Sequence, residues 1–357
     1  MNNEIAISVI VPFFNAEHNL EKCLTSLLNQ TFDKKFEILM INDCSQDNSI
    51  NLIKKFNISY LKILSLSKNS GPSIARNKGL DEAQGKYVFF LDADDFIEPE
   101  TFTELFNTAE NNDSDIVFCD KKRLINSINQ FKNIFTYSSD INFNYEEITE
   151  EIKKRISDHH YSLRVIGCHG KLIKRSIILN NNLIFNKQLR FMEDEIFILD
   201  VLGYSVKISY LRKQLYNYNI NPTIPTARSD AFNFIFPIEN FKIMSMHLKN
   251  SLIRRGLNKN ETEKFKKQSL IFFIIYTLLS YSLSIFRGKV DYKKGIESRG
   301  VIIKEIVKDK EIRDAAKFYL RSKDESFLIP IAIQLGSKIF LEIACNLRVK
   351  KILKKII

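Results

Sequence analysis

Carboxylates at close spacing follow a strongly apolar run near residue 90. Phe89–Leu91 leads directly into Asp92–Asp95. Such neighbours repel each other unless a cation joins them, and Mg²⁺ or Mn²⁺ commonly bridges one or two carboxylates to substrate phosphates. The spacing therefore predicts a metal–diphosphate clamp at Asp94, helped by Asp92. Solvated turn or N-cap aspartates are the alternative, because Pro99 begins a helix soon afterwards.

An earlier apolar run, Phe36–Asn42, also ends in a carboxylate, that of Asp43. At the end of a strand this group can accept a hydrogen bond from a nucleobase N–H or a ribose hydroxyl. The alternative is a cap for a helix over Gln46–Phe56, although Ser45 or Asp47 could cap that helix equally well.

A cation near both carboxylate segments is Arg76. The sequence Gly71-Pro72-Ser73 opens a helix that ends near Gly85, so Arg76 lies on its first or second turn. A guanidinium in that place can add to the positive end of the helix in holding a diphosphate. A surface salt bridge is the alternative.

The elements that must position these groups alternate between β-branched runs and amphipathic stretches from residue 5 to about 119. This alternation is typical of βαβ units and a mostly parallel sheet. Ligands bind such sheets at the carboxyl ends of the strands, here Pro12–Asn15, Asn42–Ser45 and Asp92–Asp95. The predicted strands are Ile5–Val11, Phe36–Asn42, Leu61–Ser65, Tyr87–Leu91 and Asp115–Cys119.

The pattern after residue 120 is weaker. Residues 120–160 predict an irregular connection that includes a helix near Tyr145–Ile156, and the Asn221-Pro222 pair marks a break. Helices are predicted for Lys171–Leu179 and Glu193–Leu202, and strands for Val206–Tyr210 and Leu215–Asn219. These boundaries give two parts, a catalytic α/β domain at 1–225 and a helical C-terminal region at 226–357.

Two segments of the C-terminal region bear on membranes. The uncharged run Leu270–Phe286 has 17 residues, fewer than the about 20 that span a bilayer, and a buried helix is favoured. Lys338–Ile357 interleaves basic and apolar residues, as in an amphipathic helix on an anionic membrane surface or for oligomer contacts. An ordinary solvated helix face is the alternative.

Charge is divided unevenly along the chain. Residues 1–120 contain 10 basic and 19 acidic residues, a balance of −9, so the remainder carries +20 of the net charge of +11. An acidic front half needs a cation or a few basic groups to hold an anionic nucleotide, whereas the basic remainder favours an anionic neighbour. The five scattered cysteines predict neither a disulfide framework nor a zinc site and fit a reducing compartment.

Four motifs follow one another in the front half, Ile7–Asn15, Asn42–Ser49, Asn69–Gly79 and Leu91–Asp95. In this order they resemble the family 2 glycosyltransferases with the GT-A fold. The resemblance covers about residues 5–120 and resumes at Lys171–Arg175 and Arg190–Phe197. One departure is Cys44, because these proteins usually carry glycine there. The family has a Rossmann-like, mostly parallel sheet.

The resemblance implies inverting transfer from a nucleotide-diphosphate sugar, usually a UDP-sugar, with Mn²⁺ or Mg²⁺. It implies that Asp194 is the catalytic base and that Asp94 and Asp92 bind the metal. The donor-site residues that it implies are Pro12, Phe14, Asn15, Asp43, Asn69, Arg76, Asp92, Ala93 and Asp94. Direct displacement does need a carboxylate base and a neutralised leaving diphosphate. Without the resemblance, an acidic helix N-terminus is the favoured interpretation of Glu193–Glu195.

The expected activity is single transfer of a hexosyl or N-acetylhexosaminyl group to a hydroxyl of a lipid-linked, lipopolysaccharide or capsule-type acceptor. The expected location is the cytoplasm or the inner face of the plasma membrane, with the oligomeric state open. One alternative is a catalytically silent nucleotide-sugar or glycan-binding module. Nucleic-acid binding is disfavoured because no such motif occurs. His159, His160 and His169 have no metal-ligand spacing, and packing or surface roles are favoured.

Overall fold

The computed structural model describes residues 4–125, 137–157, 167–189, 192–220, 238–288, 291–320 and 327–354. His159, His160, Arg190, Phe191, the Asn221-Pro222 break and the expected domain boundary near 225 lie outside these ranges. The chain forms two compact units, which are described separately. The first comprises Met1–Thr149 and Leu163–Ile224, and the second comprises Glu150–Ser162 and Pro225–Ile357.

A nine-stranded mixed sheet forms the centre of the first unit, in the order β3-β2-β1-β4-β8-β6-β9-β5, with β7 also paired to β9. β1, β2, β3 and β4 are mutually parallel where they pair, as the alternating pattern predicts. The strands are β1 (Ile7–Phe13), β2 (Phe36–Asn42), β3 (Leu61–Ser65), β4 (Tyr87–Phe90), β5 (Phe96–Ile97), β6 (Ile116–Ile125), β7 (Ile141–Phe143), β8 (Lys171–Lys174) and β9 (Ile208–Ile220).

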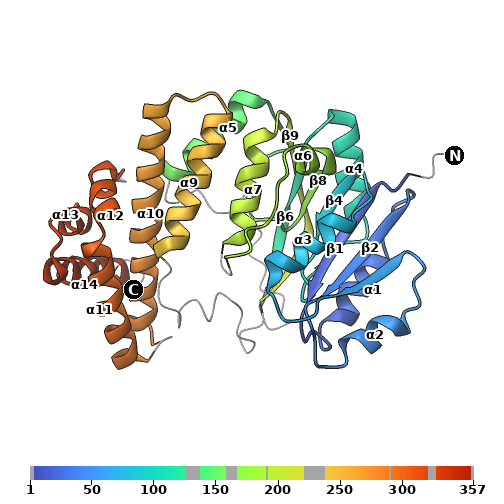
Figure 1. Cartoon of the computed structure of the whole chain (residues 1–357), viewed down its shortest axis with the longest axis horizontal. Coiled ribbons are helices and arrows are strands. Elements are labelled where there is room, and N and C mark those ends of the chain that lie inside the picture. The colour runs from blue at the N-terminus through green and yellow to red at the C-terminus, as the bar shows by residue number, and fades with distance from the viewer. Residues whose placement is uncertain are drawn as a thin grey trace. The chain divides into compact units, whose positions relative to one another are not determined.

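Helices cover both faces of this sheet (Figure 1). Alternate residues of β1 face opposite sides, so Val9 and Val11 pack with α1 and α4 in one core, whereas Ile10 meets Gly79 of α3 on the other face. The helices are α1 (Leu20–Leu28), α2 (Ser49–Lys55), α3 (Pro72–Glu82), α4 (Thr101–Asn112), α6 (Arg175–Asn180) and α7 (Glu193–Tyr204), and α5 (Tyr145–Ser157) begins in this unit. The predicted α/β class is confirmed.

Two predicted elements are wrong. Lys171–Leu179 is not one helix, because Lys171–Lys174 forms the short strand β8 between β4 and β6, and only Arg175–Asn180 is helical. The two strands predicted for Val206–Tyr210 and Leu215–Asn219 are one continuous strand, β9. The register between β6 and β9 shifts on both sides of Asp120, opposite the middle of β9. This irregularity lets β9 continue as one strand through the polar residues 212–214.

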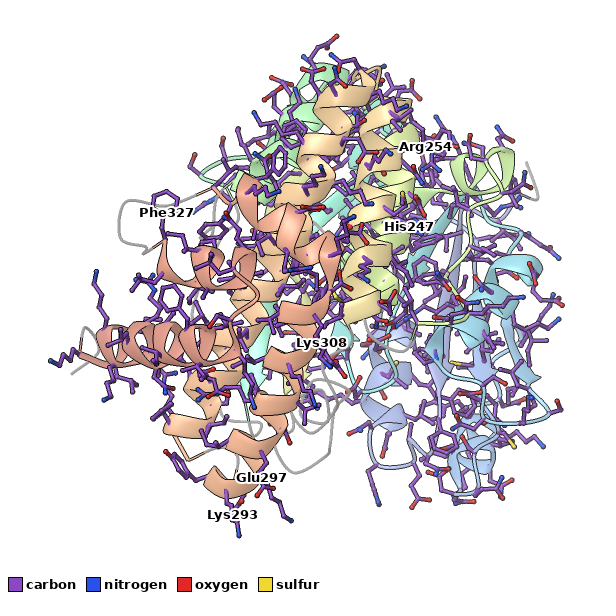
Figure 2. The ribbon with its side chains drawn as sticks, turned by 60° about the vertical axis from the view of Figure 1, so that its left-hand side comes forward. His247, Arg254, Lys293, Glu297, Lys308 and Phe327 are labelled. Carbon is purple, nitrogen blue, oxygen red and sulfur yellow. The ribbon has the colours of Figure 1, made fainter. Side chains whose placement is uncertain are left out.

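The second unit is helical. Its longest helix, α10, packs against α9, α11, α12 and α14, and Figure 1 shows it between α9 and the later helices. Figure 2 shows Lys293 and Glu297 near the start of α11 and Lys308 at its other end. The elements are α9 (Ile238–Arg254), α10 (Lys259–Phe286), α11 (Tyr292–Lys308), α12 (Lys310–Ala315), the 3₁₀ helix η1 (Ala316–Phe318), α13 (Leu328–Gln334) and α14 (Lys338–Lys354).

α10 contains the uncharged run that raised the question of a membrane span. Among the described residues it is the one helix long and apolar enough to cross a bilayer, and 56% of its most apolar window is buried inside the protein. Phe273 stacks on Phe241 of α9, with ring centroids 6.1 Å apart. Lys249 and Lys266 form ion pairs with Glu263 and Glu311 respectively. This packing supports the interpretation of α10 as a core helix.

Candidate active site

The candidate site lies at one edge of the sheet in the first unit. Because β1, β2 and β4 are parallel, their carboxyl ends at Phe13, Asn42 and Phe90 meet at this edge. β8 runs antiparallel to β4, so its amino end reaches the same edge, and His169 forms a bridge with Phe90. β8, which was predicted as part of a helix, therefore brings His169 to the carboxyl ends of the parallel strands.

The loop after β1 is held by the loop after β2. The Asn15 backbone N–H donates to Ser45 Oγ at 3.0 Å, and Asn15 Oδ1 accepts from the Gln46 backbone N–H at 2.8 Å. Asn15 adopts a left-handed φ of 45°, which Asn tolerates better than most residues. Phe14 is exposed and Pro12 is half-buried. The loop thus presents an aromatic ring at the sheet edge.

Asp43 has a structural task. Its two carboxylate oxygens accept hydrogen bonds from the backbone N–H groups of Ser70, at 2.7 Å, and Gly71, at 2.8 Å. The side chain is buried and does not cap α2, which begins only at Ser49, where Asp47 accepts from the Ser49 N–H and hydroxyl. Asp43 therefore fixes the turn into α3.

Two further residues near Asp43 are Cys44, which has an unusual backbone conformation, and Asn69, a predicted donor-site residue. Cys44 adopts a left-handed φ of 65°, the conformation that favours the glycine of the resembling family. Asn69 is exposed at the turn that Asp43 holds. Asn69 therefore lies at the same sheet edge as Asp43 but is open to solvent.

Arg76 lies inside the protein, where it joins two carboxylates from distant parts of the chain. It is 4% exposed, its Nη2 lies 2.9 Å from Asp92 Oδ1, and its Nη1 lies 2.9 Å from Glu193 Oε1. Its guanidinium also lies over the Phe185 ring, 5.4 Å from the centroid. Arg76 thus forms buried ion pairs and not the surface salt bridge that was the alternative to diphosphate binding, and it contacts the site through Asp92 and Glu193.

Both carboxylate oxygens of Asp92 have a partner. Its Oδ1 contacts Arg76, and its Oδ2 lies 2.7 Å from His169 Nε2. Burial disfavours the charged form, but Arg76 and then His169 outweigh burial and hold the pKa of Asp92 below its usual range. An ionised carboxylate can only accept, so Nε2 of His169 carries the proton that it donates.

The other nitrogen of the same imidazole ring faces the predicted base. Nδ1 of His169 lies 3.8 Å from Asp194 Oδ2. Burial lowers the pKa of His169, so its ring is neutral near pH 7 and Nδ1 has a lone pair. Gly167, with a φ of 128°, passes close by, and a Cβ there would lie 3.2 Å from Asp194 Oδ2. The chain thus passes tightly around the two side chains.

Asp194 itself lies in the first turn of α7, after Met192, which has a left-handed φ of 67°. Its Oδ1 accepts from the Glu195 backbone N–H at 2.9 Å. Its side chain is 20% exposed, against 11% for Glu193. Oδ2 is therefore the oxygen that can meet a substrate hydroxyl.

The two remaining carboxylates of the Asp92–Asp95 segment differ. Asp95 is buried and accepts from the Tyr216 hydroxyl at 2.6 Å and from the Asn219 backbone N–H at 2.8 Å, which binds the segment to β9. Asp94 is exposed, and Ala93, between Asp92 and Asp94, is buried. Desolvation in the site and the charge of Asp92 raise the pKa of Asp94 to about 6. Asp94 is the carboxylate of this segment that fits a hard divalent cation shared with a diphosphate.

Sequence reasoning missed two partners in this site. Glu193 appeared only as an acidic helix start, yet it is the second partner of Arg76. His169 appeared without a role, because the residues after it were predicted as a helix and not as a strand that returns to the edge. A glycine on each side of the Cys168-His169 pair was the available signal of a constrained turn.

Comparisons with known proteins bear on the family and the fold. Residues 8–178 match the model of glycosyl transferase family 2. A cholesterol galactosyltransferase of Borreliella burgdorferi is 28% identical over 328 residues, 87% of this chain and 86% of that protein. The poly(ribitol-phosphate) β-N-acetylglucosaminyltransferase TarS of Staphylococcus aureus is 29% identical over 270 residues, which are 75% of this chain but 43% of TarS.

A solved structure extends the likeness in fold. The crystal structure of S. aureus TarS 1-349 in complex with UDP-GlcNAc superposes with a TM-score of 0.69 at 19% identity, covering 96% of this chain and 91% of that one. The strand order of the sheet, the order of the sequence motifs and the family match therefore all indicate the same fold. The first unit has the GT-A fold, and residues 8–178 of the chain match glycosyl transferase family 2.

Proposed function

We propose that this chain transfers a single sugar from a UDP-sugar, with inversion, to a hydroxyl of a cell-surface glycan or glycolipid. The observation that carries the proposal is the convergence of Asp92, His169 and Asp194 at the edge where Asp94 is exposed. A carboxylate for the acceptor proton and a carboxylate for the leaving diphosphate then lie at the same sheet edge. Direct displacement at an anomeric carbon needs both.

On the donor side, Asp94 would hold Mn²⁺ or Mg²⁺, and Asp92 keeps Arg76 and His169 in place. When bound, the ion would neutralise the charge that grows on the leaving diphosphate. The loop of Phe14 and Asn15 and the exposed Asn69 would contact the nucleoside. The acidic first 120 residues explain why the diphosphate needs a cation there.

On the acceptor side, Oδ2 of Asp194 would take the proton of the attacking hydroxyl. Once protonated, this oxygen faces the lone pair on Nδ1 of His169 across 3.8 Å, and a hydrogen bond formed as the two atoms approach would stabilise the protonated base. Since His169 also donates to Asp92, the ring keeps one orientation throughout. His169 is thus a positioning residue for both carboxylates.

The acceptor class is supported by the relatives, which are named for transfer to cholesterol and to poly(ribitol-phosphate). UDP as the nucleotide is supported by the UDP-GlcNAc complex of TarS. We place the activity in the cytoplasm, at the inner face of the plasma membrane, where lipid-linked acceptors are assembled. A catalytically silent binding module with the same fold is the competing proposal.

Calorimetric titration with UDP, GDP and dTDP, each with and without Mn²⁺, tests the donor site. We expect UDP binding that needs Mn²⁺ and is lost in Asp94→Ala, while Asp33→Ala, an exposed aspartate of the same unit, keeps it. Binding of UDP to Asp94→Ala as tight as to the wild type would remove the metal role of Asp94.

Turnover separates the enzyme from the silent module. Incubation with labelled UDP-sugars and a lipid or glycan acceptor should give a product whose anomeric configuration, measured by NMR, is opposite to that of the donor. UDP binding without transfer to any acceptor would favour the silent module. A product with retained configuration would overturn inversion and the role of Asp194 as base.

A further inference from the structure

The exposed apolar side chains of this protein are concentrated near its C-terminus. Of the 19 large hydrophobic residues that are exposed in the described part of the chain, seven lie between Phe327 and Leu347. The two most exposed of all are Ile339, at 72%, and Leu335, at 68%. Contiguous exposed apolar residues of this kind mark a surface that contacts a partner or a membrane.

Helix α14 is apolar on two opposite sides. Leu341, Cys345 and Val349 follow one another at intervals of four and are buried within the protein. Ile339, Ile343 and Leu347 follow the same interval, and they are 72%, 51% and 53% exposed. Residues four apart share a helix face, so α14 has a buried apolar row and a separate exposed one. The buried row anchors α14, and the exposed row is left for a partner.

Lysines continue the exposed row. At 100° per residue, Lys350 and Lys354 lie within the same arc as the row Ile339, Ile343 and Leu347, and Lys351 lies at its margin. All three lysines are exposed. The first turns of this face are therefore apolar and its last turns are basic.

Acidic groups are scarce in this region. Glu342 is the only acidic residue of α14, against five basic residues, and no Asp or Glu follows it in the sequence. Residues 225–357 as a whole contain 27 basic and 13 acidic residues, a balance of +14. The exposed face of α14 thus combines apolar side chains with a positive field that no neighbouring carboxylate of the helix cancels.

We propose that the exposed face of α14 docks on an anionic lipid bilayer. Apolar side chains would enter the boundary between headgroups and acyl chains, and Lys350, Lys351 and Lys354 would contact the phosphates. A second copy of the chain is a poorer occupant, because it would bring two basic faces together. This inference does not depend on sugar transfer, since it concerns the second unit and is tested by lipid binding.

Vesicle flotation compares the two halves of this surface. We expect binding to phosphatidylcholine vesicles that contain phosphatidylglycerol, and weak binding to phosphatidylcholine alone. Ile339→Ser with Ile343→Ser should reduce binding at least about tenfold, because each apolar side chain contributes on the order of a tenfold change. Ile184→Ser, at a 58% exposed position of the first unit, is the matched control.

The basic half is tested by charge reversal. Lys350→Glu with Lys351→Glu should weaken binding to anionic vesicles by about 100-fold or more, since each lysine near an anionic surface is worth about fivefold and each reversal adds a repulsion of similar size, about 25-fold per position. Lys54→Glu with Lys55→Glu changes the net charge equally at exposed positions on α2 and should have little effect. If both double variants lost vesicle binding equally, the protein would be attracted to the vesicles by its total charge, and docking by α14 would be overturned.

A single tryptophan can report insertion, because the chain contains no Trp. In Ile343→Trp we expect a blue shift of emission on adding anionic vesicles, and quenching by lipids brominated in their acyl chains. Ile184→Trp should show neither. An unshifted spectrum for Ile343→Trp would overturn insertion. So would a dimer, seen by light scattering, that dissociates in the Ile339→Ser, Ile343→Ser variant, because the face would then belong to a second copy.

Discussion

The two oxygens of the Asp194 carboxylate lie in different surroundings. Oδ1 is engaged by the Glu195 backbone N–H, whereas Oδ2 faces His169 Nδ1 across 3.8 Å. Asp194→Asn keeps the shape and the helix-start hydrogen bond but removes the base. We expect kcat to fall by about 10²- to 10⁴-fold, the usual contribution of a general base, with UDP affinity nearly unchanged. Single-turnover transfer assays and UDP calorimetry measure the two separately; near-normal kcat would exclude Asp194 as the base.

His169 serves two carboxylates at once, so its loss should affect turnover more than donor binding. His169→Ala removes the donor to Asp92 Oδ2 and the lone pair that faces Asp194. We expect kcat to fall about 10- to 100-fold, the effect of one hydrogen bond to a charged group, with a small change in KM for the donor. His169→Gln retains an N–H donor and should recover part of kcat. Equal loss in both variants would mean that His169 only packs.

At the residue scale the sequence predicted which carboxylates lie at the sheet edge but not which partners they contact. The spacing of the carboxylates in Asp92–Asp95 is visible in the sequence. Their different partners appear only in the fold, where Asp95 accepts a hydrogen bond from Tyr216 and Asp92 forms an ion pair with Arg76. Arg76 and Glu193 are 117 positions apart, and no local pattern links them. Ion pairs between distant segments depend on topology, which propensity does not contain.

Among the elements, the loop after β2 holds a residue in a conformation that suits glycine. Cys44 has a φ of 65°, and a non-glycine residue in this region carries a cost of about 1–2 kcal/mol. Replacement of Cys44 by glycine would remove this cost, but part of the stabilisation is offset because glycine loses more conformational freedom on folding. We expect Cys44→Gly to raise the free energy of unfolding by about 0.5–1 kcal/mol in urea titrations. Cys44→Ala keeps the strain and should be neutral, and a destabilised Cys44→Gly would contradict this account.

The strands and helices of the front half were predictable because each carries its own periodicity. β2 and β3 have the predicted bounds, and β1 and β4 differ by a few residues at their ends. β8 was not predictable, since Lys171–Lys174 is four residues long and becomes a strand only between β4 and β6. Tertiary pairing overrides local preference in so short a segment.

Across the whole chain, the division of charge predicts opposite salt responses for its two ligands. The first 120 residues carry −9 and residues 225–357 carry +14. Salt screens repulsion as well as attraction. At saturating Mn²⁺, UDP binding should therefore hold or strengthen as salt rises, while binding to anionic vesicles should weaken steeply. Titrations of both ligands over the same salt series measure this, and a parallel fall of both would contradict it.

The bridge from Arg76 to Asp92 and Glu193 also constrains how the sequence can change over generations. Loss of one partner leaves a buried charge uncompensated, which costs about 3–5 kcal/mol, whereas joint replacement by apolar groups can be nearly neutral. Positions 76, 92 and 193 should therefore substitute together, a case of strong epistasis between distant sites. An ancestor that passed through a single replacement would have needed that much stability to spare.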